Sequence, residues 1–159
     1  MSGPGKDTPG VIAPPPLIYL GFLLAGWALE RWVVTDLTLG LPDPLRRWGA
    51  VGLIGLGFLI EGAAIERFRR KGTAVEPWKP STALATDGVY RLSRNPIYLG
   101  FTLIYLGIAL AMDAPVALAL ILPCLIVIDQ FVIAREERYL ETRFGEPYRA
   151  YKRSVRRWL

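Results

Sequence analysis

The stretch RLSRNPIYLGF, residues 91–101, brings two arginines, an asparagine and a proline directly before a long apolar run. Pro96 suits the first turn of a helix, where a backbone N–H has no intrahelical partner to lose. Asn95 then falls at the N-cap position, where its side chain can accept a hydrogen bond from a free backbone N–H. The stretch therefore predicts a helix that begins at Pro96. A simple membrane boundary does not require Tyr90, Arg94 and Tyr98 at the same helix start.

Four apolar segments follow one another along the chain, and together they decide the fold class. They cover residues 15–32, 48–65, 97–112 and 114–134, and hydrophobic residues make up 52% of the 159 residues. About 20 helical residues cross a hydrocarbon core of roughly 30 Å, so the third segment is short for a span. We expect an all-α, polytopic membrane helix bundle of about four spans, or five helices. Residues 15–159 form its one domain, after a disordered lead-in over residues 1–14 that is rich in Pro and Gly.

Basic residues gather in two blocks that predict the orientation in the membrane. Of 19 Lys and Arg, seven lie within residues 67–94 and eight within residues 135–157. The turn MDAP, residues 112–115, has one acid and no base. Because basic loops stay on the cytoplasmic side, we expect both termini in the cytoplasm and Asp113 outside. Residues 135–159 then form a cytoplasmic, amphipathic C-terminal segment.

The composition excludes several kinds of site. The chain has no histidine and one cysteine, Cys124, so His bases, His or Cys metal clusters and an internal disulfide are excluded. We expect no metal and no nucleic acid as ligands. Glu61 lies in the middle of the second apolar segment, where an ionised carboxylate facing lipid costs about 2.5–3.5 kcal/mol. We therefore expect Glu61 to face the bundle or a polar cavity, either as a substrate contact or as a neutral structural acid.

A second motif, EERYLETRFGEPYRAY, occupies residues 136–151, directly after the fourth apolar segment. Asp129 lies seven and eight residues before Glu136 and Glu137, a spacing that favours one helix face for the acids. Gly145 can end this helix, and the Glu-Pro pair that follows can start another. The motif predicts a carboxylate near the membrane boundary and a short helix with two tyrosines on one face. A plain interfacial amphipathic helix has the same pattern.

Together, GVYRLSRNPIYLG at residues 88–100 and the motif at 136–151 resemble a known group of integral membrane enzymes. These are the isoprenylcysteine carboxyl methyltransferases and phospholipid methyltransferases. Their pattern is GxY, then R-[HN]-P-x-Y-x-G, two spans, and EExxLxxxFGxxYxxY, and the similarity covers residues 82–158. The resemblance implies S-adenosylmethionine as methyl donor, held between the last helices and the C-terminal segment. We expect an integral protein of a bacterial or archaeal cytoplasmic membrane.

The resemblance also implies which residues contact the donor. Carried over residue by residue, these contacts fall on Thr82, Ala83, Leu84, Ala85, Tyr90, Asn95, Pro96, Ile97, Tyr98 and Glu136. We add three residues of suitable chemistry to the cofactor-binding set: Arg94, Tyr148 and Tyr151. Arg94 can pair with a carboxylate, either that of the donor or that of Glu136. The tyrosines, together with Trp158, can stack on adenine or contact the sulfonium.

The sequence identifies the residues of the chemical step less closely than those of the donor site. The candidates for a catalytic role are Arg135, Glu136 and Glu137, and the candidate substrate contacts are Glu61 and Arg135. The eukaryotic enzymes have histidine where this chain has Asn95. An arginine that serves their substrate corresponds to Val132 here, with Arg135 close by.

Three acceptors remain open: a prenylated cysteine, a phospholipid amine and a small hydrophobic metabolite. The chain is also similar to membrane sterol and enone reductases, which use a nicotinamide cofactor, but these are usually larger. A small non-enzymatic scaffold whose basic ends bind anionic lipid is the third alternative. The oligomeric state does not follow from the sequence.

Overall fold

The computed structural model describes residues 9–10, 12–35, 37–74 and 79–159, and over these ranges it is entirely helical, without strands. The α-helices are α1 Pro15–Trp32, α2 Asp43–Arg70, α3 Pro96–Ala111, α4 Pro115–Val127, α5 Ala134–Phe144 and α6 Glu146–Ser154. A 3₁₀ turn, η1, covers Gly88–Arg91, and a π turn, η2, covers Ile128–Ile133. The all-α prediction is therefore confirmed, whereas most of the lead-in predicted for residues 1–14 lies outside the described residues.

The helix starts and stops follow the local sequence. Pro96 occupies the first turn of α3, as expected, and Gly145, with a φ of 61°, separates α5 from α6. The helix that contains the fourth apolar segment continues beyond residue 134, because α4, η2 and α5 form one continuous helix, Pro115–Phe144, of 30 residues. The run of helix-forming Glu, Arg, Tyr and Leu after residue 134 extends it.

Two of the described helices, α2 with 28 residues and Pro115–Phe144 with 30, are long and apolar enough to cross a membrane. Helix α3 is apolar but has 16 residues. This finding supports a membrane protein, and the number of spans stays a prediction.

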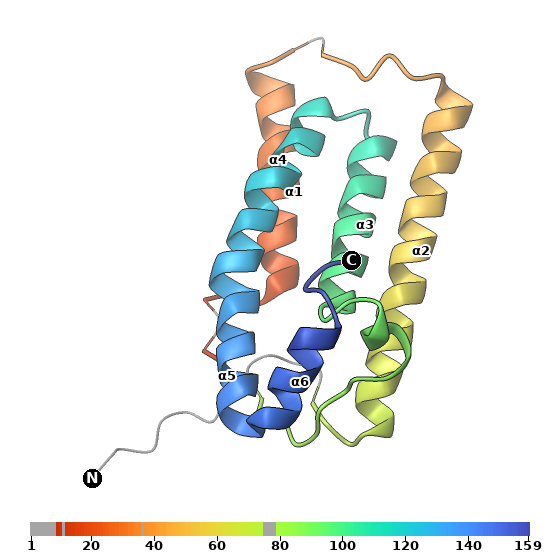
Figure 1. Cartoon of the computed structure of the whole chain (residues 1–159). Helices are drawn as coiled ribbons and strands as arrows, with labels where there is room; N and C mark the ends of the chain where they lie inside the picture. Colours follow the sequence, from red (N-terminus) through yellow and green to blue (C-terminus); the bar gives the residue numbers. More distant parts are fainter. Residues whose placement is uncertain (1–8, 11, 36, 75–78) are drawn as a thin grey trace.

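Helices α2 and α3 pack closely through glycines (Figure 1). A Cβ atom added to Gly107 would lie 2.7 Å from Ile54 Cγ1, and one added to Gly100 would lie 2.9 Å from the Gly57 carbonyl oxygen. Neither position has room for a side chain, so the two helix backbones approach closely here. Glu61 is 9% exposed at this interface, which confirms that it faces the bundle.

The first helix completes the bundle by packing on α3 and α4. A Cβ atom added to Gly26 of α1 would lie 2.5 Å from Ala117 Cα, so these two backbones are in direct contact. The Tyr19 hydroxyl donates a hydrogen bond to the Tyr98 carbonyl oxygen at 3.1 Å. These contacts hold the start of α3 in place beneath the cavity described below.

The two basic blocks lie at the same end of the bundle. In Figure 1, α6 and the segment before α3 gather at the end opposite the α3–α4 turn, and the chain after α6 runs back toward α3. At the α3–α4 end, Arg46 donates to the Ala111 carbonyl oxygen at 3.1 Å and to Asp43 at 2.7 Å. Asp113 in the turn accepts from the Leu39 N–H at 3.0 Å. These bonds tie the connections of that end together.

Candidate active site

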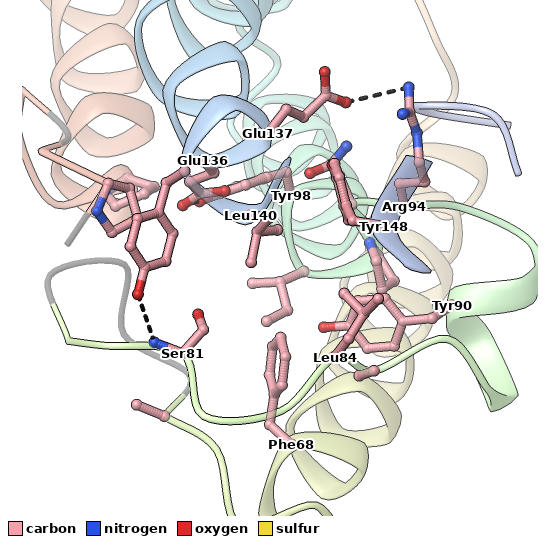
Figure 2. Close-up of a pocket in the computed structure, with 18 of the residues that line it drawn as sticks. Phe68, Ser81, Leu84, Tyr90, Arg94, Tyr98, Glu136, Glu137, Leu140 and Tyr148 are labelled. Atoms are coloured by element: carbon pink, nitrogen blue, oxygen red, sulfur yellow. Dashed lines mark hydrogen bonds and ion pairs between the residues drawn. The ribbon is translucent and has the colours of Figure 1, made fainter. Parts of the chain in front are cut away.

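A cavity of about 240 Å³ lies at the end of the bundle where the two basic blocks meet. Its walls come from α2, the segment 81–85, η1, the start of α3, α5 and α6. One water needs only about 10–15 Å³ on this measure, so the cavity has room for a small organic molecule. Figure 2 shows Phe68, Leu140 and Tyr90 around this space, with Glu136 and Tyr98 on one side and Arg94 on another.

Aromatic side chains form one wall of the cavity. The rings of Phe68 and Tyr90 lie 5.3 Å apart, and those of Tyr148 and Tyr151 lie 6.2 Å apart. The Tyr151 hydroxyl donates to the Tyr90 carbonyl oxygen at 2.7 Å, which joins α6 to η1. Burial raises the pKa of Tyr90, Tyr148 and Tyr151 well above the usual value. These phenols therefore stay neutral and present apolar faces.

A carboxylate and a phenol meet on the opposite side of the cavity. The Tyr98 hydroxyl donates to Glu136 Oε1 at 2.5 Å, a short, charge-assisted hydrogen bond. Tyr98 lies in the first turn of α3 and Glu136 in the first turn of α5, so this bond joins the two motifs of the sequence. Glu136 is half-buried and lines the cavity, where its second oxygen can accept from a ligand.

Arg94 lines the cavity with an incompletely paired guanidinium. Its side chain is 10% exposed, and its Nη2 lies 3.2 Å from Glu137 Oε1. Its Nε and Nη1 are buried and have no hydrogen-bond partner among the described residues. Of the two carboxylates expected to pair with Arg94, Glu136 does not, because Glu137 takes that place and Glu136 turns toward Tyr98. Pairing with the carboxylate of the donor stays a prediction. Buried donors without partners are costly, so they mark a place where an acceptor binds.

Asn95 stands at the N-cap position of α3 but does not cap the helix with its side chain, within the described part of the chain. Its Nδ2 instead donates to the Arg157 carbonyl oxygen at 2.9 Å. The Ser93 hydroxyl donates to the same oxygen at 3.2 Å, and the Arg94 N–H donates to the Arg156 carbonyl oxygen at 3.0 Å. The capping expectation fails because the C-terminal segment offers Asn95 a partner that is distant in the sequence.

The side chain of Arg157 holds two carboxylates together. It donates to Glu137 through Nε and Nη2, at 3.2 and 2.6 Å, and to Asp129 through Nη1 at 2.9 Å. Trp158 Nε1 donates to Asp129 as well, at 3.2 Å. The hydrogen bond to Glu137 raises the pKa of Arg157. Trp158 is thus engaged with Asp129 of the π turn, whereas the sequence suggested a stacking role for it.

Most of the expected cofactor residues line this one cavity. They are Ala83, Leu84, Ala85, Tyr90, Arg94, Asn95, Pro96, Ile97, Tyr98, Glu136, Tyr148 and Tyr151. Glu137, one of the catalytic candidates, lines it too. Thr82, Arg135 and Glu61 are absent from its described lining. Arg135 donates to the Gly10 carbonyl oxygen at 2.7 Å, and Thr82 bonds to Thr73 and Gly72.

Sequence reasoning missed several lining residues. Phe68, Ser81, Tyr139 and Leu140 all face the cavity, and the Ser81 N–H donates to the Tyr139 hydroxyl at 3.0 Å. Tyr139 and Leu140 follow Glu136 by three and four residues, so the helix period would have placed them on its face. Phe68 carries no comparable signal, because its role depends on how α2 packs against η1.

The comparisons with known proteins agree with this geometry. A family model described as phospholipid methyltransferase matches residues 45–147, about two thirds of the chain. The chain belongs to the phospholipid methyltransferase family. Membership of this family assigns it to the membrane methyltransferases. The matched residues include α2, α3, η1 and the Glu pair of α5, which build most of the cavity.

A relative from Haemophilus influenzae, described as an uncharacterized protein, is 48% identical over 63 residues. That match covers 40% of this chain and the whole of the relative. No solved structure matches this phospholipid methyltransferase family member.

Proposed function

We propose that this protein transfers a methyl group from S-adenosylmethionine to a lipophilic or amphiphilic acceptor at a membrane. The observation that carries the proposal is one cavity that combines unpartnered Arg94 donors, a Glu136 carboxylate and aromatic walls. Family membership supports methyl transfer as the class of reaction. The identity of the methyl donor and that of the acceptor are proposed in addition to this reaction class.

The cavity residues fit S-adenosylmethionine group by group. The donor carries a carboxylate, for which Arg94 offers buried N–H groups that have no partner among the described residues. It also carries an amino group and ribose hydroxyls, which the free oxygen of Glu136 can accept. Adenine needs apolar, flat surfaces, and Phe68 and Tyr90 provide them.

When bound, the donor would supply a methyl group on a sulfonium. A lone pair of the acceptor would bond to the methyl carbon, and the C–S electron pair would stay with sulfur, which leaves as the neutral thioether S-adenosylhomocysteine. Such an in-line displacement depends mainly on position, and holding two reactants together can supply roughly 7–11 kcal/mol of the barrier. The helices that line the cavity are rigidly joined through Tyr98–Glu136 and Tyr151–Tyr90. The chain's contribution is therefore to hold both reactants still and to exclude water.

Glu136 is the best placed of the three catalytic candidates to accept a proton. Glu137 is bound by both Arg94 and Arg157, so its charge is already compensated. Arg135 is a permanent cation that donates to the Gly10 carbonyl oxygen and is absent from the described lining of the cavity. An amine acceptor that arrives protonated must lose a proton before it attacks, and the Glu136 carboxylate can take it. A carboxylate acceptor needs no base.

The acceptor reaches this site from the bilayer. The four helical segments form four spans, both basic blocks lie at the cytoplasmic surface, and the cavity lies between them at that depth. Pro15, Pro16 and Phe101 form its apolar side next to α1, where an acyl or prenyl chain would lie. A prenylated cysteine, a phospholipid amine and a small hydrophobic metabolite are the acceptor classes with this shape.

The test is transfer of a deuterated methyl group. The purified protein in lipid nanodiscs is incubated with methyl-deuterated S-adenosylmethionine and bacterial lipid extract, and products are followed by mass spectrometry. We expect an acceptor that gains the labelled methyl with the wild type and not with Glu136→Ala. If the protein binds a reduced nicotinamide cofactor and does not bind S-adenosylhomocysteine, this proposal is wrong and the protein is a reductase.

A further inference from the structure

Arg157, near the C-terminus, contacts the cavity-lining residue Glu137 but does not itself line the described cavity. Glu137 Oε1 is shared between Arg94 Nη2 and Arg157 Nε, each at 3.2 Å. Glu137 Oε2 is bound by Arg157 Nη2 at 2.6 Å, which is the shortest of these contacts. Arg157 thus engages both oxygens of Glu137, and Arg94 has a share in one.

This division leaves Nε and Nη1 of Arg94, a residue of the cavity lining, without partners among the described residues. If Arg157 did not hold both oxygens, Glu137 would be a 5%-exposed carboxylate with Arg94 as its neighbouring cation. It would then turn its second oxygen onto Arg94, because a buried carboxylate without a partner is costly. The donors of Arg94 that now lack partners among the described residues would be taken.

Contacts within the fold hold Arg157 in the position from which it binds both oxygens of Glu137. Its carbonyl oxygen accepts from Ser93 and Asn95, which flank Arg94 in the sequence. Its Nη1 is held by Asp129 at 2.9 Å. The backbone and the side chain of Arg157 are therefore both anchored, one to the segment that carries Arg94 and the other to the π turn.

We propose that Arg157 is a positioning residue that occupies both oxygens of Glu137 and so keeps the Arg94 guanidinium available to a carboxylate-bearing methyl donor. This inference rests on the proposed function, since it concerns the same donor site. Arg157 itself does not line the described cavity, so its effect is transmitted through Glu137.

The test compares the affinity of the full-length protein for S-adenosylhomocysteine by titration calorimetry. The variants are Arg157→Gln, Glu137→Gln, the double variant, and Arg156→Gln as a control with the same charge change on an exposed neighbour. We expect Arg157→Gln to bind about tenfold more weakly and Arg156→Gln to match the wild type. The double variant should regain most of the loss, because no carboxylate then competes for Arg94.

Recovery in the double variant separates positioning from a merely structural role, in which losing a second partner would weaken binding further. If Arg157→Gln does not fold, Arg157→Lys provides the test. Lysine keeps the charge but cannot span both carboxylate oxygens in a fork, so we expect an intermediate affinity.

Equal affinity of Arg157→Gln and the wild type would overturn the inference and leave the proposed function standing. So would a double variant that binds no more tightly than Arg157→Gln. Absence of binding in the wild type and in Arg156→Gln would overturn the proposed function, and this inference with it.

Discussion

Two arginines at opposite ends of the bundle are buried to a similar degree but paired very differently. The side chains of Arg46 and Arg94 are 15% and 10% exposed. Arg46 uses both terminal nitrogens, one on the Ala111 carbonyl oxygen and one on Asp43, and among the described residues its Nε alone lacks a partner. Arg94 uses Nη2 on Glu137, and its Nε and Nη1 have no partner within the described residues.

The difference supports the proposal that the cavity end of the molecule binds a ligand. Arg46 closes the connections around the α3–α4 turn, so its cost of burial is largely offset within the fold. Arg94 faces a cavity, and the fold leaves part of its burial cost uncompensated. A ligand with an acidic group would compensate it on binding. Arg46 therefore stabilises the fold, and we propose that Arg94 pairs with a ligand.

The largest effect should come from removing the guanidinium on the cavity side. We expect Arg94→Gln to lower the affinity for S-adenosylhomocysteine by at least about a hundredfold, because more than one charge-assisted hydrogen bond is lost. Arg46→Gln should leave the affinity unchanged and lower the midpoint of thermal unfolding. Calorimetric titration and thermal unfolding of both variants measure the contrast. An equal loss of affinity in both would mean that the two ends do not differ in function.

The next effect concerns the carboxylate on the other side of the cavity. Glu136→Ala should cost roughly 1.5–3 kcal/mol of binding, about tenfold to a hundredfold in affinity, because Tyr98 also loses its acceptor. Arg47→Ala is the control, since its side chain is 75% exposed at the far end. The same titration measures both variants, and matching affinities would show that Glu136 is not a ligand-binding residue.

A smaller effect is expected in the helix pair that joins the two ends. In Gly100→Ala the new methyl would collide with the Glu61 side chain, so we expect a loss of about 1–3 kcal/mol in unfolding free energy. Gly55→Ala is the matched control, because no described atom lies within 4 Å of its Cβ position. It should be neutral or gain up to about 1 kcal/mol. Thermal unfolding in detergent compares the two, and a neutral Gly100→Ala would refute the tight packing.

The orientation of the two ends can be tested without altering either site. We expect a membrane-impermeant thiol reagent outside the cell to label Met112→Cys, beside Asp113, and not Arg156→Cys. Both positions are exposed, while the native Cys124 is buried. Transfer activity should change little in either variant. Labelling of Met112→Cys from the cytoplasmic side alone would reverse the proposed topology.

Local patterns in the sequence predicted the helices well. Pro96 and Gly145 place a helix start and a helix break where the structure has them, because both residues act on their own backbone. The apolar runs gave the cores of the helices, but α2 extends from Asp43 to Arg70, beyond the predicted 48–65. The charged residues at the two ends of α2 are helical, but they lie outside the apolar run from which the helix was predicted.

The pairing of the charged residues could not be predicted from the sequence. Arg94, Glu137 and Arg157 lie far apart in the chain, and only the folded path of the C-terminal segment brings them together. For the same reason Asn95 bonds to Arg157 rather than to its own helix. The resemblance to known enzymes indicated the right segments, and the tertiary contacts decide which side chain meets which.

The π turn Ile128–Ile133 determines the direction in which the side chains of α5 point around the helix axis. In an unbroken α-helix, residues eight apart are rotated by about 80° about the axis. The wider π turn rotates less per residue and removes most of that offset, so Asp129 and Glu137 point the same way and both reach Arg157. A helical wheel drawn at constant period places these two acids about 80° apart on one broad face, and the π turn brings them closer in angle. A change that made this helix regular would therefore split the pair while leaving every charge in the sequence intact.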